Sequence, residues 1–410
     1  MTDPMNVEHW TVPAVDAGSL TLVSGRDFVI SDNWGDMVRG AVHGLLHDDR
    51  RFLDLWVLSV EGCELHPLAT ATPTPFSAVF VARVHELGGR PLPLILVRRR
   101  SVGRGMREVI EIHNSGPERY DLEVRCEIGA DFGHLFDVKS GRPTTALGSL
   151  RATDHGLLIE ENHDGHRCTR LASCPGPSAV RAGGCSWRLG LPPRDHRGVR
   201  VTVEPVTTDD DGRGRAAIDA RAVDELAHHR YEMWQQLIPQ VVSPDPRLSV
   251  AVEKSLEDLA SLRIFDTAHP ELTVVAAGAP WYMTLFGRDS LLTSYMALPF
   301  APWLVRGVLH ELAELQGRTV DPSSGEEPGK ILHELRTRGA PGPFSTRARY
   351  YGTVDATPLY VLVAAEAARW GAVSTADRAW LVPAVDAAMR WIREHGDRND
   401  DGFVDYAPQG

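Results

Sequence analysis

The chain has 410 residues, and a single hydrophobic core seldom serves that length, so we expect two or three domains. Hydrophobic residues make up 43% and charged residues 24% of the sequence, which excludes a disordered chain and is typical of a folded, soluble protein. The formal net charge of −12 argues against a nucleic-acid partner, because affinity for phosphate backbones rests on clustered Lys and Arg. No apolar run approaches membrane-spanning length, so no membrane partner is expected.

The N-terminal segment shows no basic start followed by an apolar stretch, and therefore no secretory signal. The five cysteines are an odd count, which in such a chain favours reduced thiols and a cytoplasmic location. Three of them, Cys168, Cys174 and Cys185, follow His163 and His166 and could be drawn as metal ligands. Their spacing lacks the paired Cys-x2-Cys knuckles of a structural zinc site, so we interpret them as small buried strand residues.

The first half of the chain has the pattern of short β-strands. From about Ser19 to Pro205, short runs such as SLTLVSGRDFVIS, SAVFVARVHEL and REVIEIHNSG alternate apolar and polar residues and are broken by Gly, Pro, Asp and Asn. Many such strands with turn residues between them indicate an antiparallel β-sandwich, which we place at residues 15–210. No dinucleotide-binding or P-loop signature interrupts the strands, so no organic cofactor is expected.

The second half has the pattern of helices. After the charged, glycine-containing stretch TTDDDGRGRA, apolar residues recur every three and four positions. We assign residues 211–245 to a linker helix and residues 246–410 to an all-helical domain. Later helices are predicted in GRDSLLTSYMALPF, APWLVRGVLHELAELQGR, DATPLYVLVAAEAARWG and TADRAWLVPAVDAAMRWIREHG. Five or six helices of this kind could form a small bundle or the first part of a larger closed assembly.

The segment GAPWYMTLFGRDSLL places two aromatic residues and an Arg-Asp pair where an apolar helix begins. Trp281 and Tyr282 could be core residues, and Arg288 with Asp289 could be a local ion pair at the positive end of the helix dipole. However, the preceding Gly287 lets the backbone approach another group closely. An arginine fork and a carboxylate can fix sugar hydroxyls, and an aromatic face can stack on a sugar ring, so the segment favours a carbohydrate site.

Two later loops carry further candidates for the same site. PGKILHELRTRG holds His333, Glu334 and Arg336, which either solvate a surface loop or line a substrate site. RYYGTVDATPLY holds Tyr351 and Asp355. Capping of the helix that follows would account for Asp355, but it explains the two tyrosines before it, Tyr350 and Tyr351, less well.

The stretch DRNDDGFVDY has the spacing of a calcium-binding loop. Asp397, Asn399 and Asp401 stand at positions one, three and five, Phe403 would offer its carbonyl, and Asp405 follows. Oxygen ligands on alternate residues suit Ca²⁺ better than a softer metal, so a structural Ca²⁺ ion is expected. The alternative is a metal-free turn, because the bidentate Glu that ends the full twelve-residue loop is absent.

Taken in order, GAPWYMTLFGRDSLL, PGKILHELR, YYGTVDATPLY and DGFVDY resemble the bacterial and archaeal amylo-α-1,6-glucosidase family, which is glycogen-debranching-like. In the first half, EVIEIHNSG and IGADFGHLFDVKSG look like the N-terminal sandwich of that family, so the resemblance spans nearly the whole chain. One departure is DDRRFLD, where the family usually has Asp-Thr-Arg-aromatic-Leu-Ser. The resemblance implies a β-sandwich followed by the N-terminal part of an (α/α)6 barrel, as in six-hairpin glycosidases of the mannosylglycerate-hydrolase-like group.

The resemblance also implies inverting hydrolysis of an α-glucosidic bond in an α-glucan, with one carboxyl group as acid and another activating water. Arg288 and Asp289 would bind hydroxyls of the sugar at the cleaved end, and Trp281 and Tyr282 would line the same subsite. The general acid and base are expected beyond Gly410, so the catalytic residues stay unknown, and we expect this chain to be an inactive N-terminal portion of a longer glycosidase. The alternatives are a hydrolase of a small glycoside, such as mannosylglycerate or a trehalose-like disaccharide, and a non-catalytic carbohydrate-binding protein.

Overall fold

A computed structural model of the chain describes residues 18–142, 147–153, 156–161, 167–207, 220–265, 272–336 and 349–405. The chain divides into two compact units, residues 1–229 and residues 230–410. The boundary falls within helix α2 (Ala220–Leu237), in the segment that the sequence assigns to a linker helix. His163 and His166 lie outside the described residues. No helix in the described ranges combines the length and the apolar character that a membrane crossing requires.

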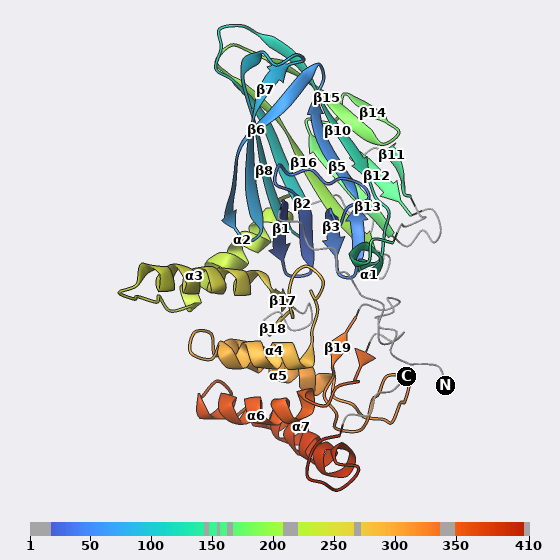
Figure 1. Ribbon diagram of the computed structural model, residues 1–410, viewed down its shortest axis with the longest axis vertical. Coiled ribbons are helices and arrows are strands. Elements are labelled where there is room, and N and C mark those ends of the chain that lie inside the picture. The colour runs from blue at the N-terminus through green and yellow to red at the C-terminus, as the bar shows by residue number, and fades with distance from the viewer. Residues whose placement is uncertain are drawn as a thin grey trace, which may run out of the picture. The chain divides into compact units, whose positions relative to one another are not determined.

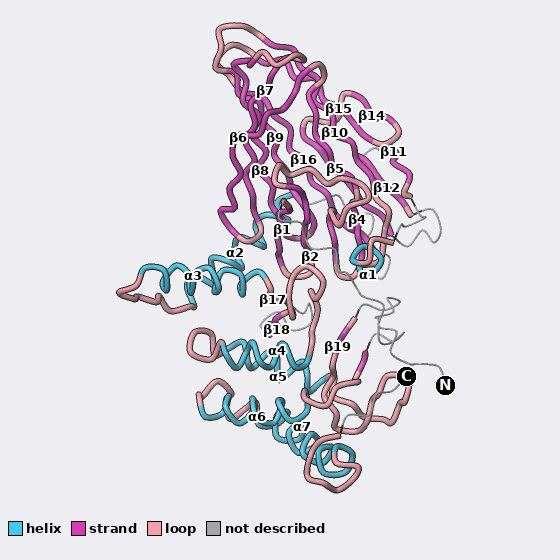
Figure 2. Tube along the Cα trace, viewed as in Figure 1, coloured by secondary structure: helices cyan, strands magenta, loops and turns pink. Residues whose placement is uncertain are grey.

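Among its described residues, unit 1 has antiparallel strands in three sheets and, besides the first part of α2, one short helix (Figures 1 and 2). One sheet has the order β1-β2-β3-β4: β1 (Ser19–Ser24), β2 (Asp27–Asp32), β3 (Gly44–His47) and β4 (Arg50–Leu53). Another has the order β14-β15-β10-β5: β5 (Leu55–Val60), β10 (Tyr120–Gly129), β14 (Ala179–Arg181) and β15 (Gly184–Leu191). The helix is α1 (Leu135–Lys139).

The largest sheet of unit 1 has eight strands in the order β11-β12-β13-β16-β9-β8-β7-β6. They are β6 (Cys63–Thr74), β7 (Ser77–Glu86), β8 (Pro91–Gly103), β9 (Gly105–Asn114), β11 (Ser149–Thr153), β12 (Gly156–Glu160), β13 (Arg167–Cys174) and β16 (His196–Thr207). Neighbouring strands pair antiparallel throughout this sheet. This architecture confirms the antiparallel, strand-rich first half that the alternating sequence predicts.

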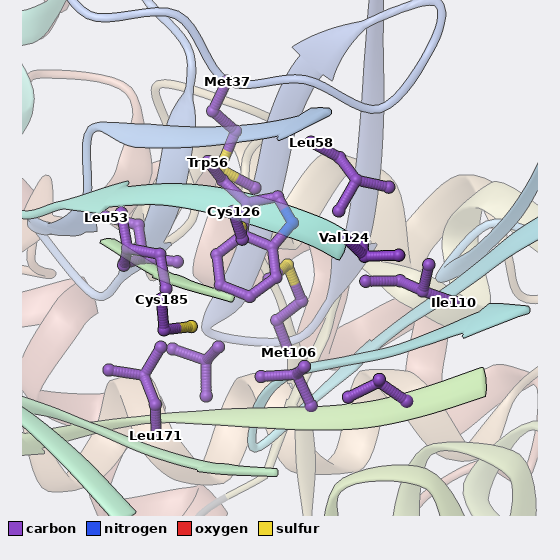
Figure 3. Packing of buried hydrophobic residues seen from close by; sticks show 14 of the residues in the cluster. Met37, Leu53, Trp56, Leu58, Met106, Ile110, Val124, Cys126, Leu171 and Cys185 are labelled. Atoms are coloured by element: carbon purple, nitrogen blue, oxygen red, sulfur yellow. The ribbon is translucent and has the colours of Figure 1, made fainter. Parts of the chain in front are cut away.

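In the three sheets of unit 1, alternate side chains point into one hydrophobic core. On β9, Met106, Ile110 and Ile112 are buried, while Val109 between them is only half-buried, as a period of two requires. Figure 3 shows side chains from all three sheets meeting in this core: Met37, Leu53, Trp56, Leu58, Met106, Ile110, Val124, Cys126, Leu171 and Cys185. Burial of each large apolar side chain contributes about 1.5–3 kcal/mol, so this core is the main source of the stability of unit 1.

Cys126 and Cys185 are directly opposite each other on β10 and β15, and both are buried free thiols. Burial raises the pKa of the Cys185 thiol to about 12 and also raises that of Cys126. A thiol with a high pKa is a poor nucleophile and a poor metal ligand. Cys185 is therefore a core residue, as we interpret it from the sequence. The same interpretation is wrong for Cys174, which is exposed at the end of β13, and Cys168 is only half-buried.

A buried ionic cluster lies within the sandwich of unit 1. Glu108 accepts hydrogen bonds from Arg98 Nε at 2.5 Å and from Arg100 Nε at 2.8 Å, and Trp56 Nε1 donates to it at 3.1 Å. Burial by itself would raise the pKa of Glu108, but Arg100 and Arg98 outweigh that effect and hold it below its usual value. All three charged side chains are buried, so Glu108 and Arg100 depend on this cluster to compensate their loss of hydration, while Arg98 also pairs with Asp36.

The segment DDRRFLD, residues 48–54, whose sequence differs from the family pattern, lies against the IGADFGHLF segment of the same unit. Arg51 Nη2 contacts Asp131 Oδ2 at 2.5 Å, and both side chains are buried. Arg51 N also donates to Gly133 O at 3.0 Å, and Asp54 N donates to Gly129 O at 3.1 Å. The segment therefore has a structural role inside unit 1 through one buried ion pair and backbone hydrogen bonds.

His47 gives unit 1 a pH-dependent interaction, because its Nδ1 lies 3.0 Å from Asp27 Oδ1. Burial alone would lower the pKa of His47, but the negative charge of Asp27 outweighs it and raises the pKa to about 9. The stabilisation is complete below the unfolded pKa of about 6.5 and is lost as the pH rises toward the folded value. We therefore expect the Tm of unit 1 to fall between about pH 6.5 and 9 in calorimetry. His47→Gln should flatten this slope, and an unaltered slope would contradict the assignment.

Unit 2 is mainly helical, as the three- and four-residue periodicity predicts. Its helices beyond α2 are α3 (Pro246–Ser261), α4 (Gly287–Met296), α5 (Trp303–Glu314), α6 (Ala356–Arg369), α7 (Arg378–Trp391) and the π-helical η1 (Ile392–Gly396). Two short antiparallel ladders accompany them: β17 (Arg263–Phe265) with β18 (Thr273–Val275), and β19 (Glu334–Leu335) with β20 (Arg349–Tyr350). Helix α4 packs against α5 and α6, and α7 packs against α5 and α6 (Figure 1). A complete or partial (α/α)6 barrel stays a prediction.

Candidate functional site

The first turn of α4 is held against β19 by a close backbone approach. Gly287 N donates to His333 O at 2.9 Å, and Phe286 forms an isolated antiparallel bridge with Glu334. A Cβ atom at Gly287 would lie 2.0 Å from the carbonyl oxygen of Leu332, a distance that no side chain can occupy. Glycine at this position therefore brings the start of α4 and the strand β19 together.

Three half-exposed charged side chains meet where α4 and α6 begin. Arg288 Nη1 donates to Asp355 Oδ2 at 3.1 Å, and its Nε lies 3.7 Å from Asp289 Oδ2. Asp355 also accepts a hydrogen bond from Thr353 Oγ1 through its other oxygen. The side chains of Arg288, Asp289 and Asp355 are 36–45% exposed, so they keep polar atoms available to a ligand. We call these three residues the ionic trio.

Asp355 departs from its expected role as a helix cap. It occupies the N-cap position of α6, but its side chain makes no capping hydrogen bond. Burial by itself would raise its pKa, whereas the hydrogen bonds from Thr353 and Arg288 lower it, and the net effect places the pKa below the usual value. Asp355 is therefore an ionised partner of Arg288 at neutral pH.

Aromatic rings line up beside the ionic trio in edge-to-face contacts. The ring centroids of Tyr282 and Phe286 are 5.8 Å apart, those of Phe286 and His333 are 5.7 Å apart, and those of His333 and Tyr350 are 5.7 Å apart. Tyr282 at one end is 43% exposed. Edge-to-face rings fix each other in place, so the row gives the site a rigid aromatic side.

His333 is the polar member of this row. Burial, with a smaller effect of the nearby Arg288, lowers the pKa of His333, so its imidazole is neutral at pH 7. Its Nδ1 atom is buried and has no hydrogen-bond partner among the described residues. A neutral imidazole can both donate and accept one hydrogen bond, as a sugar hydroxyl also can.

Four of the predicted substrate-binding residues are buried within unit 2. Trp281 and Tyr351 are almost fully buried, and Tyr351 donates its hydroxyl proton to Leu315 O at 2.6 Å. Glu334 and Arg336 are also buried and form an ion pair with each other. The Arg336 guanidinium also lies over the Phe286 ring, 5.4 Å from its centroid. Because all four side chains are buried, they leave little surface for contact with a ligand.

The structure thus brings together five of the nine predicted substrate-binding residues: Tyr282, Arg288, Asp289, His333 and Asp355. It adds Phe286 and Tyr350, which stand in the predicted segments but not among the predicted binding residues, and Thr353. Tyr350 and Tyr351 are adjacent on an extended segment, where successive side chains point to opposite sides, so only one of them can face His333. The alternation of β20 is the signal that could have identified Tyr350.

The predicted calcium loop is closed by hydrogen bonds within itself. The Asp397 carboxylate accepts the N–H groups of Asp401 at 3.0 Å and Gly402 at 2.8 Å, and Asn399 Nδ2 donates to Asp401 Oδ2 at 3.0 Å. The Phe403 N–H donates to Asp401 Oδ1 at 2.9 Å. Within the part of the chain that the structure describes, no group of three or more His, Cys, Asp or Glu side chains is arranged to hold a metal ion. As arranged, the loop is a turn built on carboxylate-to-backbone hydrogen bonds.

Arg398 anchors the same loop to the rest of unit 2. Arg398 N donates to Asp405 Oδ2 at 2.8 Å, while Arg398 Nη2 donates to Glu327 Oε1 at 2.9 Å. Glu327 also accepts a hydrogen bond from Trp391 Nε1 at 2.8 Å. The loop is therefore tied to α7 and to the segment before β19 through one buried carboxylate, that of Glu327.

Comparison with known proteins gives one family match. Residues 22–202, which lie in unit 1, match the family model described as the N-terminal domain of some glycogen debranching enzymes. This segment is less than half of the 410 residues, and no curated protein sequence gives a significant match.

Two solved structures are similar to parts of the chain. One, a protein provisionally named a kojibiose phosphorylase from the human microbiome, has a TM-score of 0.43 and 6% identity, covering 90% of this chain and 67% of the other. The second, a galactose mutarotase-like protein from Lactobacillus casei, has a TM-score of 0.29 and 7% identity, covering 46% of this chain and 100% of the other. These low TM-scores do not establish a shared fold with either protein. The family match of residues 22–202 is therefore the finding that relates the chain to known proteins.

Proposed function

We propose that the protein acts on an α-glucan and that the ionic trio of unit 2 binds one sugar ring. The single observation that supports this proposal most is the half-exposed Arg288–Asp355 pair beside an exposed tyrosine ring. A sugar hydroxyl can accept a hydrogen bond from the guanidinium and donate one to a carboxylate, so the trio matches both of its hydrogen-bonding roles. The debranching-type match of unit 1 supports a glucan as the substrate class.

In the proposed complex each group has a distinct role. Arg288 and Asp289 hold hydroxyl groups, Asp355 orients the guanidinium of Arg288, and Tyr282 packs against the C–H face of the ring. His333 offers its neutral imidazole as a further hydrogen-bonding group. An uncharged sugar brings no counter-charge, and it can bind to the guanidinium of Arg288 because Asp355 already compensates that charge.

The reaction that we propose is inverting hydrolysis of an α-glucosidic bond, of the amylo-α-1,6-glucosidase type, by an (α/α)6 barrel glycosidase. Such a reaction needs one carboxyl group that is protonated before it donates to the leaving oxygen and a second that activates water. Asp355 does not suit the first role because its pKa is held below the usual value. We therefore propose that the trio binds the substrate and that the two catalytic carboxyl groups are supplied elsewhere.

Arg288→Ala is expected to weaken the binding of maltotriose about tenfold or more, since a hydrogen bond to a charged group contributes about 1.5–3 kcal/mol. Isothermal titration calorimetry with the full chain measures this effect. Arg369→Ala is the matched control, because Arg369 lies in the last turn of α6 and pairs only with the nearby Glu366 among the described ion pairs. Equal affinities of Arg288→Ala and the parent would rule out the trio as the sugar site.

The trio also supports a second candidate, a non-catalytic carbohydrate-binding protein, because an ionised Asp355 binds a sugar without cleaving it. Turnover assays on a branched α-glucan, mannosylglycerate and trehalose separate the candidates. Hydrolysis of the branched α-glucan supports the debranching proposal, and hydrolysis of only a small glycoside supports the alternative substrate. Maltotriose binding without turnover of any of the three supports the binding protein.

A structural Ca²⁺ ion at residues 397–405 is a separate proposal, which rests on the ligand spacing alone. If the ion binds, Ca²⁺ should raise the Tm of unit 2, and Asp401→Ala should abolish that rise, because Asp401 supplies a carboxylate. Without Ca²⁺, Asp397→Ala should still lower the Tm, since Asp397 holds the turn through two backbone N–H groups. Thermal unfolding with Ca²⁺ and with a chelator measures both effects, and a parent Tm that ignores Ca²⁺ excludes the site.

A further inference from the structure

The loop that follows β2 presents a tryptophan to solvent. Residues 32–37 connect the end of β2 to the core, and the Trp34 side chain is 43% exposed. At the far end of the loop, Met37 is buried beside Trp56 (Figure 3), and the two residues exchange backbone hydrogen bonds of 3.0 Å. The loop therefore carries its exposed indole on a backbone that is fixed in the core at both ends.

Backbone hydrogen bonds close this loop on itself. Asp32 Oδ1 accepts the N–H groups of Trp34 and Asp36, both at 2.8 Å. Asp32 N donates to Asp36 O at 2.9 Å, and Thr70 Oγ1 donates to Asn33 O at 2.6 Å. These contacts restrain the residues on both sides of Trp34.

The buried ionic cluster also holds this loop, through hydrogen bonds to its backbone carbonyl groups. Arg98 Nη1 donates to Trp34 O at 3.0 Å, and both Arg98 Nη2 and Arg100 Nη2 donate to Gly35 O, at 2.9 and 2.5 Å. Gly35 has φ +90°, and a Cβ there would lie 2.8 Å from the ring of Phe80, so only glycine fits between the loop and the core. Two buried arginines thus fix the peptide groups that carry Trp34.

This arrangement is not explained by stability alone. A buried ionic cluster is commonly no more stabilising than well-packed hydrophobic side chains of similar volume, but it fixes geometry through directional hydrogen bonds. The acidic groups of the loop are engaged internally, since Asp32 accepts backbone N–H groups and Asp36 Oδ1 pairs with Arg98 Nη1 at 2.5 Å. The loop therefore offers an exposed indole on a restrained backbone, and its neighbouring charges are compensated, which favours an uncharged ligand with a flat apolar face.

We propose that Trp34 is a contact site for an α-linked glucan chain on unit 1, with the indole stacked on the C–H face of a pyranose ring. The choice of an α-glucan rests on the proposed function, and Trp34 lies inside the segment that matches the debranching-type N-terminal domain. This site belongs to unit 1 and shares no residue with the ionic trio of unit 2. It gives the protein a second binding contact for a long glucan chain, in addition to the sugar site that we propose for the ionic trio.

The test is affinity electrophoresis of the full chain in native gels that contain glycogen. We expect glycogen to retard the parent and Trp34→Ala to weaken the apparent affinity at least about fivefold, the loss expected from one aromatic stacking contact. Trp370→Ala is the matched control, because Trp370 is a similarly exposed tryptophan, 53% exposed, at the end of α6. It should migrate as the parent does.

Three results would overturn the inference: no retardation of the parent, equal retardation of parent and Trp34→Ala, or an equal loss in the Trp370→Ala control. Maltotriose titrations separate this inference from the proposed function. If Trp34→Ala loses glycogen affinity while Arg288→Ala keeps maltotriose affinity, the Trp34 site stands and the trio fails. If Arg288→Ala loses maltotriose affinity while Trp34→Ala keeps glycogen affinity, the trio stands and the Trp34 site fails.

Discussion

Replacing Glu108 with glutamine should destabilise unit 1 by about 3–5 kcal/mol, because the substitution leaves Arg100 buried without a compensating charge and leaves Arg98 with Asp36 alone. The amide keeps the size of the side chain, so the loss reports on charge rather than on packing. Urea unfolding followed by tryptophan fluorescence measures the change. The transition should move to a lower urea concentration, since a mutation that alters stability without altering exposed surface shifts the midpoint.

Glu86→Gln is the matched control for this prediction. Glu86 pairs with Arg90 at 2.8 Å four residues along the chain, and both side chains are exposed. An exposed ion pair contributes about 0–1 kcal/mol, so the control should leave the midpoint nearly unchanged. Equal effects of the two substitutions would show that the Glu108 cluster does not carry a desolvated charge.

The Glu108 cluster also predicts the direction of the acid response. Because the folded pKa of Glu108 lies below its unfolded value, its stabilisation is present above the unfolded pKa of about 4.3. It is lost as the pH falls from there through the folded pKa. The difference in stability between the parent and Glu108→Gln should therefore shrink at acid pH.

Gly287→Ala should destabilise unit 2 by about 3 kcal/mol or more and should also abolish sugar binding at the trio. The new Cβ would lie 2.0 Å from the carbonyl oxygen of Leu332, which belongs to the backbone and cannot rotate away. The first turn of α4 must then move, and it carries Arg288 and Asp289 with it. Thermal unfolding and maltotriose titration of the same variant test the two consequences together.

Gly396→Ala is a matched control in unit 2. The nearest atoms to a Cβ at Gly396 are 3.5 Å away, which is ordinary van der Waals contact. This control should keep both the Tm and the maltotriose affinity within small changes of the parent. A Gly287→Ala variant that behaves like the control would contradict the close approach of α4 and β19.

Periodicity in the sequence is enough to predict the strand-rich first half and the helical second half. Side chains on β9 alternate between core and surface, and the helical repeat of α5 buries Leu304, Val308 and Leu312 on one side. Such patterns act over a few neighbouring residues, so they survive without knowledge of the fold. The segment that carries Arg288 and Asp289 is also visible in the sequence, because aromatic residues and a glycine precede the pair.

The tertiary structure decided which of the candidate side chains meet. Arg288 finds its partner in Asp355, 67 residues later in the chain, and no local pattern specifies such a pairing. Tyr351 is buried and donates a hydrogen bond to Leu315 O, whereas Tyr350 contacts His333. The register of β20 against β19 determines which of the two tyrosines faces His333.

Residue types thus determined that this protein has a strand-rich unit, a helical unit and a charged, aromatic segment at the start of a helix. The fold determined that Asp355 serves Arg288 rather than capping α6, and that Arg98 and Arg100 support the loop of Trp34. The physical reason is the range of the interactions. Hydrophobic periodicity depends on residues that are close together in the sequence. Ion pairs and close backbone approaches join segments that are far apart in the sequence and meet only when the chain packs.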